Sequence, residues 1–211
     1  MTLAGVAGEA ARHHLDMLGV VTRGTLPEGV RTLMLLGPLE PGFWGAFTAT
    51  PEYRDGRPDP LDRWSRRVID TLAHRLGAMA FFPFGGPPHQ PFVRWALASG
   101  RAHVSPVGLL VHDAAGLMVS WRGALGFAAR IDHPAPPPAP CLSCAEKPCL
   151  GACPVDALAG KGYDVAACKA DLDRTGNDCM ARGCAVRRAC PISHRHGRLD
   201  AQSAFHMRAF R

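Results

Sequence analysis

Cys141-Leu-Ser-Cys144-Ala-Glu-Lys-Pro-Cys149-Leu-Gly-Ala-Cys153-Pro154 carries four of the eight cysteines in this 211-residue chain. The other four are Cys168, Cys179, Cys184 and Cys190, and Pro191 follows the last of them. No cysteine occurs in the first 140 residues. All the thiols are therefore confined to the final third of the chain, which indicates one local cause. A buried cofactor held by thiolates is the simplest.

The first block has the spacing C-x2-C-x4-C-x3-C-P, which favours an iron–sulfur site. In ferredoxin-type runs, three close cysteines are followed by a fourth, before a proline, that binds the other [4Fe–4S] cluster. One tight loop can reach three irons of the cubane, while the fourth iron faces away and needs a remote thiolate. Proline fixes its own φ and disfavours helix in the residue before it. The chain is therefore expected to leave the first cluster at Cys153.

This logic predicts two sets of ligands that use every cysteine once. Cluster I takes Cys141, Cys144, Cys149 and the remote Cys190, and cluster II takes Cys153, Cys168, Cys179 and Cys184. Small residues fill the intervals and are expected to let backbone N–H groups approach the cluster sulfurs. They are Ala145, Gly151, Ala152, Ala157, Gly160, Gly162, Ala166 and Ala167.

Two other uses of the thiols stay open. Structural zinc sites use four thiolates in paired C-x2–4-C knuckles. Cys141 and Cys144 fit such a knuckle, but Cys184 and Cys190, with five residues between them, do not. Disulfides suit small secreted domains, and the N-terminus lacks the basic start and apolar run of a signal peptide. The cysteine pattern thus favours iron–sulfur clusters over both.

The formal net charge of +6 and the sequence pI near 9.1 raise the question of nucleic acid. Each oxidised cluster with its four thiolates contributes about −2, which brings the loaded chain to about +2. Arg182, Arg187 and Arg188 are interleaved with the predicted ligands and are expected to neutralise them. A nucleic-acid-binding motif is not recognisable, so the composition disfavours that class of partner. No apolar run approaches the ~20 residues of a membrane span.

The upstream sequence predicts alternating helices and strands. The expected helices cover residues 7–22, 60–77 and 89–99, and the expected strands cover residues 32–36, 78–82 and 124–131, with a hairpin of 107–112 and 116–121. The helix over 60–77 has the clearest ends, with Asp59 as N-cap, Pro60 at the first position and Gly77 as the stop.

Two upstream segments are candidates for a pocket. Residues 41–53 are aromatic and glycine-rich, and they form either a packing loop or one wall of a pocket. Residues 83–88, with the sequence PFGGPP, follow a predicted strand. Such a loop is either a ligand-binding turn, as in α/β proteins, or a plain connection. Packing is the commoner role for a segment like the first, and a plain connection is the commoner role for one like the second.

The predicted fold class is α+β, with an N-terminal α/β sandwich-like domain followed by a ferredoxin-type dicluster module. The N-terminal domain covers residues 1–132 and has a possible cofactor or substrate pocket. The sequence HPAPPPAP over 133–140 predicts a stiff polyproline-like linker. The module covers 141–211 and ends in a helix over 199–210.

The pattern of Cys153-Pro154, then a single Cys168, then three cysteines ending at Cys190-Pro191 resembles the dicluster ferredoxin domain of the epoxyqueuosine reductases. The likeness covers about 70 residues, with a weaker likeness over 96–127. In that family the last block is compact (C-x2-C-x3-C-P), whereas here four and five residues separate its cysteines. The resemblance implies cobalamin-dependent chemistry, with an α/β corrinoid-binding domain ahead of the module. It does not assign a catalytic residue in this chain.

Three functions follow from these patterns. The first is an electron-transfer protein that relays single electrons through two [4Fe–4S] clusters to a redox partner protein or to its own N-terminal domain. The second is an oxidoreductase of the iron–sulfur and cobalamin reductase type, with a corrinoid or flavin in the N-terminal domain. The third is a zinc-stabilised interaction module. An iron–sulfur protein without an export signal is expected in the cytoplasm, and the sequence leaves the oligomeric state open.

Overall fold

The computed structural model describes residues 2–159 and 162–211, so Gly160 lies outside the described part. The chain divides into two compact units. Unit 1 consists of residues 1–102 and 120–137, and unit 2 of residues 103–119 and 138–211. The mixture of helices and strands confirms the α+β composition. Residues 103–119, assigned from the sequence to the N-terminal domain, group instead with the cysteine-rich part of the chain.

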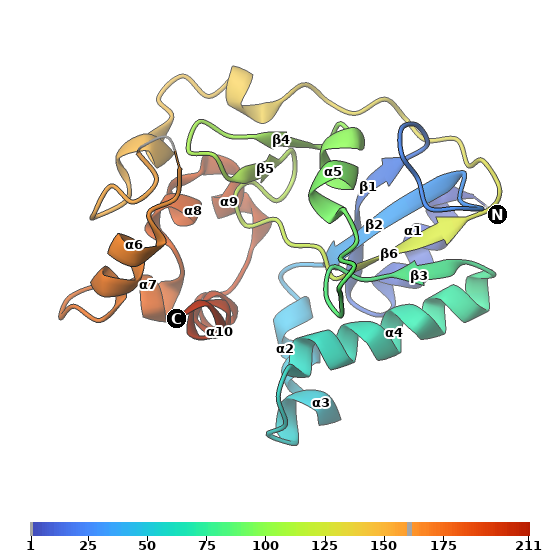
Figure 1. Ribbon diagram of the computed structural model, residues 1–211, viewed down its shortest axis with the longest axis horizontal. Helices are drawn as coiled ribbons and strands as arrows, with labels where there is room; N and C mark the ends of the chain where they lie inside the picture. Colours follow the sequence, from blue (N-terminus) through green and yellow to red (C-terminus); the bar gives the residue numbers. More distant parts are fainter. Residues whose placement is uncertain (1, 160–161) are drawn as a thin grey trace. The chain divides into compact units, whose positions relative to one another are not determined.

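Unit 1 is built on a four-stranded antiparallel sheet (Figure 1). Its order is β1 (Leu15–Val21), β2 (Thr32–Pro38), β6 (Gly123–Phe127) and β3 (Met79–Phe81). Every residue of β2 and β6 is buried, so both faces of these strands are covered. Successive side chains of a strand point to opposite faces, which explains why β2 reads as an uninterrupted apolar run.

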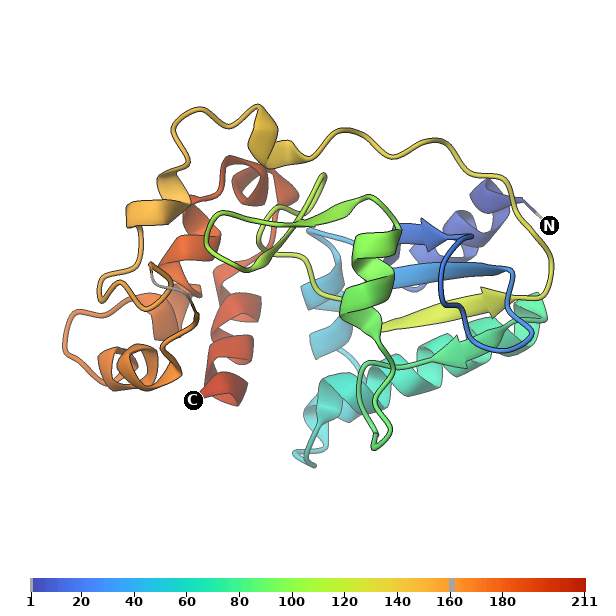
Figure 2. The ribbon, with the colours of Figure 1, turned by 45° about the horizontal axis from the view of Figure 1, so that its top comes forward.

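Three helices cover this sheet. They are α1 (Leu3–Ala11), α4 (Pro60–Leu76) and α5 (Phe92–Ala98). Helices α1 and α4 contact each other as well as the strands, and Figure 2 shows α5 crossing in front of the strands. The prediction for α4 is confirmed at both ends, because Pro60 is its first residue and Gly77, at φ +61°, ends it. Asp59 is the N-cap residue, as predicted, but its side chain makes no capping hydrogen bond.

The aromatic segment over 41–53 forms two short helices, α2 (Phe43–Thr48) and α3 (Pro51–Arg54). Phe43 and Phe47 are fully buried, and each ring meets the ring of Trp64 edge-on, with centroids 5.3 and 6.0 Å apart. This edge-to-face arrangement is a favourable packing geometry. The segment is therefore built into the core of unit 1, in agreement with the packing interpretation.

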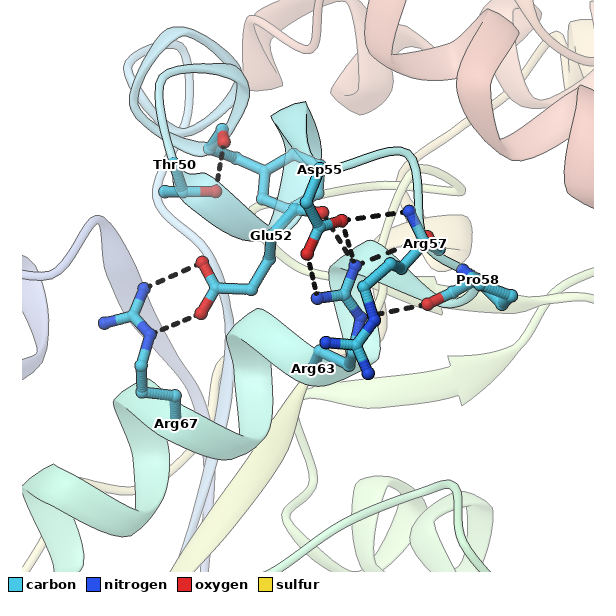
Figure 3. Close-up of polar contacts among 8 residues, drawn as sticks. Thr50, Glu52, Asp55, Arg57, Pro58, Arg63 and Arg67 are labelled. Carbon is cyan, nitrogen blue, oxygen red and sulfur yellow. Dashed lines mark hydrogen bonds and ion pairs between the residues drawn. The ribbon is translucent and has the colours of Figure 1, made fainter.

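Ion pairs fasten α3 to α4 (Figure 3). Arg63 donates to both oxygens of Asp55 at 2.8 Å, and its Nε donates to the Pro58 carbonyl at 3.0 Å. Arg67 binds the two carboxylate oxygens of Glu52 in the same forked way. These hydrogen bonds lower the pKa of both Glu52 and Asp55. All of these hydrogen bonds join groups of the protein to one another, and they hold the segment that carries the aromatic core in place.

The prediction of one helix over residues 7–22 is wrong. Helix α1 ends at Ala11, and residues 15–21 form strand β1. The apolar spacing of Leu15 and Leu18 matches a helix by coincidence, because β1 is buried on both faces and shows no alternation. A bulge between Met17 and Val20 shifts its register and further hides the period of two.

The predicted hairpin and third strand are also partly wrong. Strand β5 (Leu110–His112) pairs with β4 (Ala102–Val104), and residues 116–121 make only one isolated bridge, between Gly116 and His112. The turn is closed by the ring of His112, whose Nδ1 accepts hydrogen bonds from the N–H groups of Ala114 and Ala115. Strand β6 is shorter than predicted and joins the sheet of unit 1.

Unit 2 is assembled from short helices. They are η1 (Pro140–Leu142), η2 (Pro148–Gly151), α6 (Val165–Leu172), α7 (Cys179–Arg182), α8 (Ala185–Ala189), α9 (Pro191–His196) and α10 (Asp200–Phe210). Helix α10 confirms the predicted terminal helix. The Ser193 hydroxyl accepts a hydrogen bond from the Leu117 N–H at 2.9 Å, and Arg198 donates to the Met118 carbonyl at 2.8 Å. These bonds tie residues 103–119 to the helices. Across the described residues, no helix is long and apolar enough to cross a membrane.

Candidate metal centres

The structure brings together the four cysteines predicted for cluster I. Cys141 lies in η1, Cys149 in η2, Cys144 in the loop between them, and Cys190 between α8 and α9. All four line one cavity of about 400 Å³ within unit 2. Its other walls are mostly apolar and include Pro106, Val111, Leu117, Pro148 and Ile192. A mostly apolar cavity that opens to solvent and is lined by the four cysteines is thus present at the predicted site.

The thiols of this set sense one another. Burial raises the pKa of Cys141, and the neighbouring Cys149, Cys190 and Cys144 raise this pKa further. Burial likewise raises the pKa of Cys149, with Cys190 and Cys144 adding to the rise. Four thiolates here would repel one another in a low-dielectric site. A positively charged group among them would compensate for that repulsion, as metal binding to thiolates does.

The four cysteines predicted for cluster II form a second neighbourhood. Cys153 follows η2, Cys168 lies in α6, Cys179 begins α7 and Cys184 precedes α8. Burial raises the pKa of Cys168, and Cys184 and Cys153 contribute to the rise. Burial also raises the pKa of Cys179, with Cys184 again a contributor. The interactions therefore link all four members of the predicted set.

Proline and glycine shape the backbone at these cysteines. Cys190 is extended at φ −68° and ψ 123°, and Pro191 opens α9 as its first residue. A residue before proline is driven out of the helical region, so the chain must break between α8 and α9 where the thiol is delivered. Gly183, at φ +86°, ends α7 just before Cys184. A Cβ there would lie 2.6 Å from the Cβ of Ser203, so α10 packs against a position that only glycine permits.

Hydrogen bonds to sulfur add detail that the cysteine pattern does not contain. The Ala157 N–H donates to the Sγ of Cys153 at 3.3 Å, as expected of a small residue in these intervals. The Tyr163 hydroxyl donates to the Sγ of Cys168 at 3.1 Å. Sequence reasoning missed Tyr163, whose only signal was an isolated tyrosine five residues before a cysteine. Asn177 was also missed; its side-chain oxygen accepts the Cys179 N–H at 2.8 Å.

Ser105 is a further missed residue at the first site. Its side chain is 5% exposed and lines the cavity with the four cysteines. Its Oγ is buried without a hydrogen-bond partner among residues 2–159 and 162–211. A buried hydroxyl without a partner costs about 1–3 kcal/mol. Ser105 belongs to the cavity wall, but its Oγ is fully enclosed, so the hydroxyl does not open on the cavity.

All eight cysteines are free thiols in the structure. Within the described ranges, no three or more His, Cys, Asp or Glu side chains converge as ligands of a metal ion. That arrangement concerns the ligands of one ion, which for zinc place each sulfur about 2.3 Å from the metal. In a cubane each thiolate binds a different iron, so the sulfurs lie farther apart.

Comparisons with known proteins give a limited match. The chain is 30% identical over 135 residues to the shikimate dehydrogenase (NADP(+)) of Acidovorax ebreus (strain TPSY). It is equally similar to the same enzyme of Acidovorax sp. (strain JS42). Each match covers 57% of this chain and 45% of the relative, so the chain spans less than half the length of these curated relatives. No family model and no solved structure matches the chain.

The loop over 83–88 is held by its own neighbourhood. The guanidinium of Arg66 lies over the rings of Phe82 and Phe84, 4.7 and 5.4 Å from their centroids. The two rings are tilted against each other with centroids 5.2 Å apart. Cation–π contacts of this kind stabilise exposed loops by about 0.5–1 kcal/mol. They hold the start of the loop against Arg66 of α4, and a role in ligand binding stays a prediction.

Proposed function

We propose that this chain is an iron–sulfur electron-transfer protein that carries two [4Fe–4S] clusters. Cys141, Cys144, Cys149 and Cys190 hold cluster I, and Cys153, Cys168, Cys179 and Cys184 hold cluster II. The observation that carries the proposal is the grouping of the thiols. The members of the first neighbourhood line one cavity and contribute to the raised pKa of Cys141. The members of the second are connected through the raised pKa values of Cys168 and Cys179. The two groups have the same members as the two sets expected from the spacing.

The residues around the thiols fit such a group. The cavity is lined by four cysteines and by mostly apolar walls, which suits a cofactor held by thiolates. When bound, each cluster supplies a one-electron redox couple. Val111, Leu117 and Ile192 give the first site apolar walls that limit its contact with solvent, and the Ala157 N–H stabilises the Cys153 thiolate at the second. Both effects are known levers on cluster potential.

The match to shikimate dehydrogenases does not change this proposal. NADP-dependent enzymes of the doubly wound class bind the nucleotide at a parallel sheet, after a glycine-rich first turn. The described strands of unit 1 pair only antiparallel, and the sequence contains no such glycine fingerprint. A dehydrogenase activity would also leave the eight grouped thiols unexplained.

Anaerobic purification with metal and sulfide analysis tests the proposal. Protein reconstituted with iron and sulfide is expected to be brown, to absorb broadly near ~400 nm and to contain about eight irons per chain. Colourless protein with tightly bound zinc would contradict the proposal and favour a zinc-stabilised module. The matched control is Ser143→Ala. Ser143 lies between two ligands of cluster I, but its hydroxyl contacts only a backbone carbonyl, at 3.2 Å, among the bonds described; this variant is expected to keep all of its iron.

A further inference from the structure

Among residues 2–159 and 162–211, Tyr163 is the one side chain that donates a hydrogen bond to the sulfur of a predicted ligand. Its hydroxyl lies 3.1 Å from the Sγ of Cys168 and has only sulfur as its recorded acceptor. A hydroxyl that donates to a thiolate stabilises negative charge on that sulfur. The Tyr163 hydroxyl contacts the ligand sulfur and not iron. Tyr163 is therefore a residue that positions Cys168 and adjusts the charge on its sulfur.

The ring of Tyr163 is held in place by the end of the chain. It stacks on Phe210 of α10, with centroids 6.1 Å apart and planes inclined by 13°. Lys169, one residue after Cys168, places its ammonium 5.3 Å from the centre of the Phe210 ring and donates to the Arg211 carbonyl at 3.3 Å. Helix α10 thus fixes the donor, although the Tyr163 side chain is 41% exposed.

We propose that the Tyr163 hydroxyl raises the reduction potential of cluster II. The inference rests on the proposed function. Reduction adds one electron from an external donor and breaks no iron–thiolate bond, so the extra negative charge spreads onto the ligand sulfurs. The Tyr163 hydrogen bond strengthens as that charge grows and therefore favours the reduced state. Hydrogen bonding to cluster sulfurs is an established determinant of potential.

Tyr163→Phe tests the proposal, because it removes the hydroxyl and keeps the ring that stacks on Phe210. In redox titrations of the anaerobic protein at controlled electrode potential, we expect the midpoint potential of cluster II (the position of its wave) to fall by about 59 mV. This shift corresponds to a tenfold change in a one-electron equilibrium. The cluster I wave is expected to stay in place, and Cys149→Ser identifies the cluster II wave by abolishing the other. Ser105→Ala, at the first site, is the matched variant and should leave the cluster II wave unchanged.

Substitution of tyrosine by 3-fluorotyrosine provides the opposite perturbation. The chain has two tyrosines, and the other, Tyr53, lies in unit 1, so global incorporation is selective for this site. The fluorinated hydroxyl is more acidic and donates a stronger hydrogen bond, so the cluster II wave is expected to rise. An unmoved wave in both proteins would overturn the proposal. Loss of four irons from Tyr163→Phe would also overturn it, because the hydroxyl would then serve assembly. Wild-type protein without iron would instead refute the proposed function itself.

Discussion

The two units of this chain hold themselves together in different ways. Unit 1 has a four-stranded sheet and an apolar core, in which the aromatic Phe43 and Phe47 and the aliphatic Leu35 and Leu72 are fully buried. In unit 2, cysteines are part of the core itself, since Cys149 and Cys190 are buried together with Val111, Leu117 and Val186. Its helices α7, α8 and α9 have four to six residues each, too short to be stable alone. We infer that unit 1 is stabilised by apolar burial and that unit 2 depends on what its thiols bind.

The largest effect should follow removal of the metal. Without iron, unit 2 is expected to lose its cooperative structure, because metal-binding free energy in such modules is folding free energy. Unit 1 should remain folded. All four tryptophans (Trp44, Trp64, Trp95 and Trp121) lie in unit 1, so tryptophan fluorescence reports on that unit. Chelation should bleach the visible absorption and expose the amides of α6–α8 to hydrogen exchange without moving the fluorescence-detected urea transition. If removal of iron also abolishes the fluorescence-detected urea transition, the two units do not have separate sources of stability.

A core truncation in unit 1 should have the reverse pattern. Leu35→Ala removes a fully buried side chain in β2 and is expected to lower the free energy of unfolding of unit 1 by about 2–5 kcal/mol. The tryptophan-detected urea midpoint should fall, while the iron content stays the same. Val93→Ala is the matched control, since Val93 is 60% exposed on α5 and its truncation should change stability by less than about 0.5 kcal/mol. Loss of iron from Leu35→Ala would argue against separate sources of stability.

Two glycines of unit 2 have positive φ but differ in how closely other residues approach them. Gly183 lies at φ +86° and ψ 168° and Gly176 at φ +89°, and of the two only Gly183 would have its Cβ collide, with Ser203. Gly176→Ala is therefore expected to cost only the conformational penalty of about 1–2 kcal/mol. Gly183→Ala should cost more and displace α10 from α7. The measurement is the urea midpoint for loss of the ~400 nm absorption. Equal midpoints for the two variants would show that the approach of α10 is not required.

The smallest expected effect is a loss of stability of unit 2 at low pH. Burial, with Arg198 as a second cause, lowers the pKa of His196 from 6.5 to about 4. The unfolded state therefore binds a proton more tightly than the folded state, and unit 2 should lose stability as the pH falls from 6.5 towards 4. Because the ring is only partly buried, the loss should not exceed about 2 kcal/mol. His196→Gln is expected to show a smaller fall in the urea midpoint between pH 7 and pH 5 than the wild type. His194→Gln, at an exposed site in the same helix, should follow the wild type.

Local signals predicted much of the architecture, and they are also the source of the proposed cysteine sets. Pro60 and Gly77 bound α4 as expected, because Pro and Gly act through their own backbone preferences. The cysteine sets followed from the reach of a cubane and from the Cys-Pro breaks. Strand β1 was missed because burial on both faces removes the alternation that identifies a strand. Residues 103–119 were misassigned because their partners are distant in sequence, with Leu117 bonded to Ser193.

The supporting residues of the sites were invisible for the same reason. Ser105 lies 36 residues before the first cysteine, and only the fold brings it to the cavity wall. Tyr163 is close to Cys168 in sequence, but the Phe210 ring that fixes it comes from the last turn of the chain. Contacts of this kind depend on tertiary structure and have no periodic or spacing signature.

The partition of the eight thiols is the central claim, and iron counting on serine variants tests it most directly. Cys149→Ser, Cys190→Ser and the double variant are each expected to retain about four irons, because both residues belong to cluster I. The double variant Cys149→Ser/Cys179→Ser should retain none. If the Cys149 and Cys190 substitutions instead add, so that their double variant loses iron that each single variant keeps, the two residues do not share a cluster.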